Sequence, residues 1–193
     1  MDKAKGFTLI EVLISLLILT LGLLGLAGMQ AVAQRAELES YQRAQALVLL
    51  QDMVDRVNAN RKVAGCYAFT PSAGTAFAGT GASAPTCTSA FGTAQQRAQA
   101  NADMLAWHNL LTGAAETLGA NQVGAMVGAR GCVILDTTVT PNLYRVQVAW
   151  QGMTPTVIPT SVDATLTCAT GQYGSELQRR VISQAFPMAC LNC

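Results

Sequence analysis

One carboxylate stands near the start of a long apolar stretch, and its surroundings demand a chemical explanation. Glu11 lies in residues 6–29, GFTLIEVLISLLILTLGLLGLAGM, and no charge occurs over residues 12–34. An acid costs about 2.5–3.5 kcal/mol at the centre of a membrane helix, and less near its end. Cleavage between Gly6 and Phe7 would create an α-amine four residues before Glu11, and such an amine is mostly positive at neutral pH. The spacing predicts an ion pair, within one helix or between subunits, unless Glu11 only marks the interfacial start of an anchor.

Cysteine is the other reactive residue type, and the six cysteines are Cys66, Cys87, Cys132, Cys168, Cys190 and Cys193. In an oxidising compartment an even number indicates disulfides, with 15 possible connectivities. Cys190 and Cys193 have the spacing of a redox motif, but such motifs work at the start of a helix that follows a strand. We favour structural disulfides and expect three pairs, which are Cys66 with Cys87, Cys132 with Cys168, and Cys190 with Cys193.

His108 is the only histidine, so it cannot share a metal site with a second one. The sequence offers no confident Ser/His/Asp or Cys/His arrangement and no Gly-rich phosphate loop. We therefore expect His108 to be a surface side chain, and we expect no enzyme activity, no cofactor and no metal.

Residues 3–11 read Lys-Ala-Lys-Gly followed by Phe-Thr-Leu-Ile-Glu, which resembles the class III signal of type IV pilins and of type II secretion pseudopilins. The resemblance implies that residues 1–6 are a leader peptide, removed after Gly6 by the prepilin peptidase. That enzyme is also an N-methyltransferase, so methylation of the new Phe7 amine is implied as well. The resemblance further implies that Glu11 guides subunits into a filament.

The apolar stretch is long enough to cross a bilayer, since about 20 residues at 1.5 Å each span roughly 30 Å. Lys3 and Lys5 precede it, which favours a cytoplasmic N-terminus. We expect a single-pass inner-membrane protein with a periplasmic domain, which later resides in a pilus filament at the cell surface. A rival is ordinary signal peptidase cleavage after Ala33, but the apolar run exceeds the usual 7–15 residues and contains an acid.

The composition fits one domain and an anchor, because the chain has 193 residues and is 51% hydrophobic. Its net charge is +1, and it is zero without residues 1–6, which hold two lysines and one aspartate. No run of Lys or Arg indicates a phosphate-binding surface, so nucleic acid is not an expected partner.

The helical pattern continues beyond the anchor. Residues 30–60 contain neither Pro nor Gly and are rich in good helix formers. Apolar residues recur there at spacings of three and four, at Leu47, Leu50, Val54 and Val57. We expect one helix over residues 7–62, with 7–29 in the membrane or filament core and an amphipathic outer half, followed by a globular domain over 63–193.

In the globular part, residues 70–93 are low-complexity Gly, Ala, Ser and Thr with two prolines, which predicts a loop. Residues 95–118 predict a second helix, with a possible break at Gly113 and with Trp107 in the core. Its expected buried stripes are Ala98, Ala102 and Leu105, and then Leu111, Ala115 and Leu118.

A period of two then indicates strands. Residues 144–151 alternate as a half-buried strand, with partners at 132–138 and 179–186 and a turn at Pro141-Asn142. Residues 152–178 read as an insertion with a short strand at 165–168. The expected fold is α+β, a long N-terminal helix packed on a small antiparallel sheet.

The order of these features, with Asp103-x-x-x-Trp107, Gly131-Cys132 and alternation from Tyr144 to Trp150, is similar to PilV-type minor pilins. This resemblance implies a low-abundance subunit that primes pilus assembly. Its implied partners are other major and minor pilins, the prepilin peptidase, the inner membrane and the pilus assembly platform. The alternatives are a minor pseudopilin of a type II secretion system, a tethered adhesin that binds through residues 70–93, and a secreted CxxC redox protein.

Overall fold

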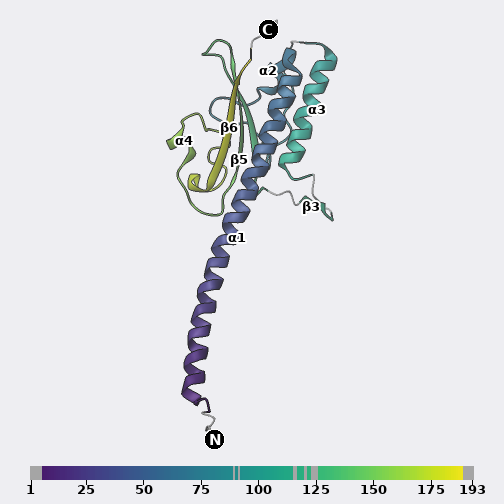
Figure 1. The fold of residues 1–193 in the computed structure, drawn as a ribbon. Helices are drawn as coiled ribbons and strands as arrows, with labels where there is room; N and C mark the ends of the chain where they lie inside the picture. Colours follow the sequence, from purple (N-terminus) through teal and green to yellow (C-terminus); the bar gives the residue numbers. More distant parts are fainter. Residues whose placement is uncertain are drawn as a thin grey trace. The chain divides into compact units, whose positions relative to one another are not determined.

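The computed structural model describes residues 6–88, 90, 92–114, 117–119, 121–122 and 126–188. The chain divides into two compact units, Met1–Ser40 and Tyr41–Cys193, and the boundary falls within the first helix. The expected α+β fold is confirmed, because a long N-terminal helix is followed by a small antiparallel sheet (Figure 1).

The first helix, α1 (Leu9–Ala59), has nearly the predicted limits. In its part that belongs to the second unit, buried side chains recur with helical spacing at Gln42, Ala46, Leu50, Met53, Val54 and Val57. Leu47, which was expected on this face, is 52% exposed. The prediction was wrong for Leu47 because this residue lies about a quarter-turn around the helix axis from the centre of the buried stripe.

Short helical turns follow α1, namely η1 (Arg61–Val63) and α2 (Ala64–Tyr67). The second long helix, α3 (Ala94–Leu111), begins with a capping box in which Thr93 and Gln96 each accept a backbone N–H of the other. Figure 1 shows α3 beside residues 41–59 of α1, and the Trp107 indole N–H donates to the Leu49 carbonyl at 2.8 Å.

The prediction that this helix extends to residue 118 was wrong. The helix ends at Leu111 because Gly113 adopts φ 82°, a left-handed conformation that terminates helices. Beyond it, β2 (Thr117–Leu118) and β3 (Asn121–Gln122) form a separate hairpin, and Ala115 lies outside the described residues.

The predicted buried stripes of this helix were also wrong for Ala98, Ala102 and Leu105, which are exposed. The buried face is Ala100, Asp103, Met104, Trp107 and Leu111. The large indole of Trp107 sets this rotation of the helix, and it is fully buried, as predicted. A Cβ at Gly131 would lie 2.1 Å from the indole, so a glycine is needed at this point of the sheet.

Among the described residues, the main sheet has the antiparallel order β1-β4-β5-β6. Its strands are β1 (Ala78–Gly79), β4 (Arg130–Asp136), β5 (Leu143–Gln151) and β6 (Arg179–Pro187). The three predicted strands are confirmed to within two residues at each end. The short β1 lies in the segment predicted to be entirely loop, because its pairing with β4 depends on tertiary position and not on composition.

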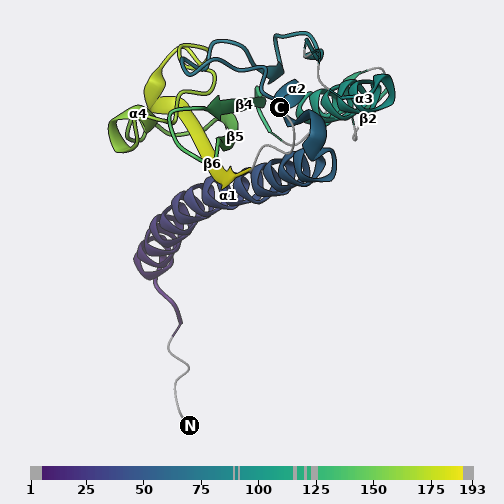
Figure 2. The ribbon, with the colours of Figure 1, turned by 90° about the horizontal axis from the view of Figure 1, so that it is seen from above.

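The sheet is covered on both faces (Figure 2). One face packs on α1 and α3 through Val133, Val146 and Val148. The other face packs on residues 168–173 and carries a second core cluster. Gln147 and Ala149 point to this second face and are fully buried, so the prediction that β5 is half-buried was wrong.

Residues 152–178 supply this second cover and contain α4 (Pro159–Val162) and η2 (Glu176–Gln178). The strand predicted at residues 165–168 does not form. Instead, the Gln147 side-chain amide donates to the Thr165 carbonyl at 2.6 Å and accepts from the Cys168 N–H at 3.0 Å. One side chain therefore satisfies the backbone groups that a strand partner would have satisfied.

Candidate membrane and assembly segment

Gly6 and Phe7 precede α1 and are not part of it. Nothing lies within 4 Å of a Cβ built on Gly6, and Phe7 is 81% exposed. The Thr8 carbonyl accepts the N–H groups of Glu11 and Val12, so hydrogen bonding of the helix starts one residue after Phe7. The Gly6–Phe7 peptide bond is therefore non-helical and open to an approaching protein.

Glu11 lies in the first turn of α1, where a carboxylate interacts favourably with the positive end of the helix dipole. Its side chain is exposed, and no ion pair links it to another residue that the structure describes. In sequence, the next acid along α1 is Glu37. Glu11 is thus an isolated negative charge at one end of a long uncharged surface.

The surface of α1 over residues 12–29 is apolar on all sides, apart from the hydroxyls of Ser15 and Thr20. An 18-residue window of this helix has a mean hydropathy of 2.6, and none of that window is buried within the chain. Its polar side chains do not need water, because the hydroxyls of Ser15 and Thr20 donate to the carbonyls of Glu11 and Leu17. By length and composition the segment can cross a bilayer or pack in an apolar helix bundle.

In the globular unit, a buried acid links three helices. Asp103 of α3 accepts from the Tyr67 hydroxyl at 2.6 Å, from Arg56 Nη1 at 3.2 Å and from Gln99 Nε2 at 2.9 Å. Burial, reinforced by the hydrogen bond to Asp103, raises the pKa of Tyr67, so this phenol keeps its proton. The sequence drew attention to the Asp103-x-x-x-Trp107 pair but not to its partners, which come from elsewhere in the chain.

His108 is half-buried and not a plain surface side chain, which corrects the sequence-based expectation. Its Nδ1 accepts the backbone N–H of Gly79 at 3.0 Å and so holds β1 against α3. Burial lowers the pKa of His108, which favours the neutral form that can accept this hydrogen bond. Within the described residues, no three His, Cys, Asp or Glu side chains gather as metal ligands would.

Two disulfides are present in the described part of the chain, Cys66–Cys87 and Cys132–Cys168. They are two of the three pairs that we expected from the sequence. Cys132 and Cys168 are fully buried in the second core cluster, whereas the first pair lies beside a surface loop. Cys190 and Cys193 lie outside the described residues, so the third pair stays a prediction.

Two protein-family models match consecutive parts of the chain. Residues 1–27 match the prokaryotic N-terminal methylation motif, and residues 28–104 match type IV pilin Tt1218. No curated protein and no solved structure matches the chain. The two family matches together cover residues 1–104, and they agree with an exposed apolar helix that begins at Leu9, two residues after Phe7. Over residues 1–104 the chain therefore matches the type IV pilin family.

Proposed function

We propose that this pilin is a minor subunit of a type IV pilus and helps to initiate filament assembly. The order of its sequence motifs, which is similar to that of PilV-type minor pilins, supports the minor role. The observation that carries the assembly role is the isolated Glu11 carboxylate, four residues after Phe7, on a helix whose most apolar 18-residue window is not buried by any residue that the structure describes.

The proposed assembly chemistry follows from charge pairing in an apolar bundle. Cleavage after Gly6 leaves a methylated, positively charged amine on Phe7. When subunits stack their helices, Glu11 of one subunit would lie among apolar side chains and needs a cation. The Phe7 amine of a neighbouring subunit is the available cation, so only the register that brings the two together is stable.

Before assembly, we propose a membrane-anchored precursor. Residues 1–6 are the leader, 7–29 the span and later the filament core, and 63–193 the periplasmic domain. The lysines at positions 3 and 5 favour a cytoplasmic N-terminus, and the disulfides favour an oxidising compartment for the globular unit. The proposed partners are other major and minor pilins, the prepilin peptidase and the assembly platform in the inner membrane.

The test replaces Glu11 with Ala in the full chain, expressed in its host without the native copy. Glu37→Ala is the matched control, because it removes another exposed acid from the same helix. We expect the Glu11→Ala protein to be cleaved and methylated at Phe7, by mass spectrometry of its N-terminus, and to reach the membrane. We expect it to be absent from sheared filaments, whereas the Glu37→Ala protein is present there.

Incorporation of the Glu11→Ala protein at the normal level would refute the assembly role. An intact leader on the native protein, or a mature N-terminus at Gln34, would refute the processing scheme. Loss of protein secretion without loss of filaments in the deletion strain would identify a type II secretion pseudopilin instead. A minor pilin predicts fewer filaments and impaired twitching, with another pilin as the main component of those that remain.

A further inference from the structure

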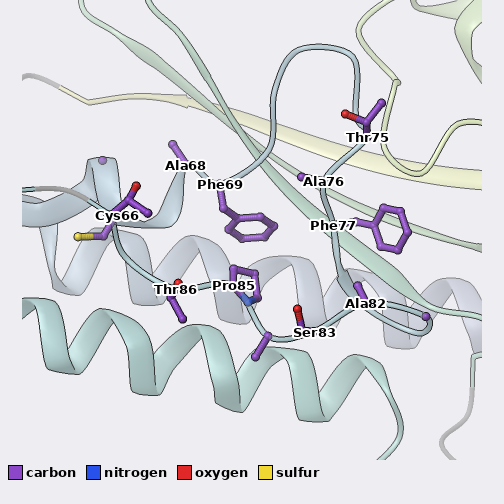
Figure 3. A pocket seen from close by; sticks show the side chains of 14 residues that line it. Cys66, Ala68, Phe69, Thr75, Ala76, Phe77, Ala82, Ser83, Pro85 and Thr86 are labelled. Carbon is purple, nitrogen blue, oxygen red and sulfur yellow. The ribbon is translucent and has the colours of Figure 1, made fainter.

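A surface pocket of about 670 Å³ lies in the loop region of the globular unit (Figure 3). This volume is within the range of roughly 300–1,000 Å³ that is usual for small-molecule sites. Its walls come from two segments, residues 65–69 and 75–88, and the second of these lies within residues 70–93, which were expected to form only a low-complexity loop. The side chains that matter for recognition are Phe69, Thr75, Ser83, Pro85 and Thr86.

The loop around this pocket is held in place at several separate points. The disulfide Cys66–Cys87 joins its two walls, and the Cys87 N–H donates to Asn101 Oδ1 on α3 at 2.7 Å. At the other end, the Gly79 N–H donates to His108 on α3. A site that is fixed before its ligand arrives loses little conformational entropy on binding.

The middle of the loop is fixed as well. Thr70 exchanges hydrogen bonds with Val133 of β4, since its N–H donates to the Val133 carbonyl and its hydroxyl accepts the Val133 N–H, both at 3.1 Å. The Ala169 N–H donates to the Gly74 carbonyl at 3.1 Å. A segment that composition marks as a loop is thus anchored to the sheet, to α3 and to the second cover.

The lining of the pocket carries no charged side chain. It combines the half-buried ring of Phe69, which packs against the first core cluster on one side, with the ring of Pro85 and the hydroxyls of Ser83 and Thr86. No hydrogen bond joins these two hydroxyls to another residue within the described part of the chain. Phe77 also borders the pocket, but its ring is directed away from Phe69 in Figure 3 and is covered by the Arg130 guanidinium, 5.2 Å from its centroid.

We propose that this pocket binds an uncharged saccharide. A sugar presents an apolar C–H face that packs on an aromatic ring, and hydroxyls that exchange hydrogen bonds with side-chain hydroxyls and free backbone groups. Phe69 would receive the apolar face, and Ser83 and Thr86 would pair with the sugar hydroxyls. An anionic sugar is disfavoured, because no lining side chain would compensate the desolvation of its charge.

The experiment measures binding of methyl glycosides of glucose, galactose and N-acetylglucosamine by saturation-transfer difference NMR. The full chain is held in phospholipid nanodiscs and purified without alkyl glycoside detergents, because their head groups are themselves candidate ligands. The methyl glycoside of N-acetylneuraminic acid is the charged probe. We expect at least one neutral glycoside to bind with a dissociation constant of about 1 mM or below, and the anionic glycoside to bind more weakly.

Two variants test the site itself. Phe69→Leu keeps the apolar volume but removes the ring, and we expect it to weaken binding about tenfold. Ser83→Ala should weaken binding severalfold. Thr80→Ala is the matched control, because Thr80 is an exposed hydroxyl residue of the same loop outside the lining.

Intrinsic fluorescence of Trp107 and Trp150, both in the core, checks that each variant is folded. Absence of binding by all neutral glycosides, equal binding of the anionic probe, or unchanged binding by folded Phe69→Leu would each overturn the proposal. Binding is measured on purified protein, so its outcome is independent of whether the chain enters a pilus.

Discussion

At the scale of single residues, buried polar side chains hold distant parts of the backbone together. Arg179 is fully buried, pairs with Glu176 at 2.6 Å and donates to the carbonyls of Leu166 and Cys168. Gln147 bonds to the same covering segment from the centre of β5. Residues 165–168, which cover this face of the sheet, do not form a strand. The side chains of Arg179 and Gln147 therefore make the hydrogen bonds to their backbone that a neighbouring strand would otherwise make.

His108 gives the globular unit a pH-dependent contact. The folded-state pKa of His108 lies below its usual value of about 6.5 because of burial, so the unfolded chain binds a proton more readily. The contribution of this contact to stability is therefore complete above about pH 6.5 and is lost as the pH falls through the lowered folded pKa. Protonation also removes the acceptor that Nδ1 offers to the Gly79 N–H.

We predict that the wild-type protein loses more stability than His108→Asn when the pH falls from 8 to 5. An asparagine oxygen can occupy the place of Nδ1 and accept the same N–H at every pH in this range. The measurement is the thermal unfolding midpoint of the two full-length proteins in the same non-ionic detergent. Parallel pH profiles would show that His108 does not titrate in this contact.

At the scale of elements, α1, α2 and α3 are joined at one buried carboxylate. Asp103 projects from α3, Tyr67 ends α2, and Arg56 belongs to the last turn of α1. Arg56 also pairs with Asp52 of its own helix at 2.7 Å, which orients the guanidinium toward Asp103. The three helices are therefore fixed in register by hydrogen bonds as well as by apolar packing.

We predict that Tyr67→Phe destabilises the globular unit by about 1–3 kcal/mol, because Asp103 loses a buried donor and keeps its desolvation cost. Tyr41→Phe is the matched control, since Tyr41 is 52% exposed and its hydroxyl contacts only the neighbouring Gln45 in the described structure. Denaturant unfolding followed by tryptophan fluorescence measures the difference. Equal midpoints for the two variants would contradict a stabilising role for the Tyr67 hydroxyl.

At the scale of the whole molecule, the two units differ in how much apolar surface they leave exposed. The globular unit buries its apolar side chains on both faces of its sheet, and the Cys132–Cys168 disulfide joins β4 to the cover over the second face. The N-terminal unit exposes an apolar helix surface far larger than a soluble monomer tolerates. Lipid or other helices must therefore cover it, which is why membrane anchoring and pilus association belong together in this protein.

We predict that loss of Cys132–Cys168 costs more stability than loss of Cys66–Cys87. The first disulfide closes the longer loop, with a sequence separation of 36 against 21, and the chain-entropy estimate is about 3–4 kcal/mol for either bond. Cys132 and Cys168 are also fully buried, so Cys132→Ala with Cys168→Ala leaves a cavity as well. Unfolding midpoints of the two double-alanine variants measure the order, and the reverse order would contradict this ranking.

Several features were predictable because they depend on local pattern. The limits of α1 follow from composition and from the absence of Pro and Gly over residues 30–60, and β5 follows from its alternation. The sequence indicated a possible break of α3 at Gly113, but not that the helix ends there and gives way to a separate hairpin. The burial of Gln147 was not predictable, because a cover over the second face of the sheet has no periodic signal in the sequence.

The candidate functional residues also separate into those that local sequence indicates and those that only tertiary contacts reveal. Gly6, Phe7 and Glu11 could be singled out because a cleavage motif and a lone acid act through local sequence. The partners of Asp103 and the role of His108 in holding Gly79 could not, because each contact joins residues that are far apart in the chain.

The sequence by itself determined that this protein has a leader-like start, an apolar helix with one acid, and a cysteine-containing α+β domain. These properties are carried by residues close together in the chain, so they need no knowledge of the fold. Only the tertiary structure decided that residues 65–88 form an anchored pocket and that both faces of the sheet are buried. Such properties arise when distant segments meet, and no local pattern of residues records where that happens.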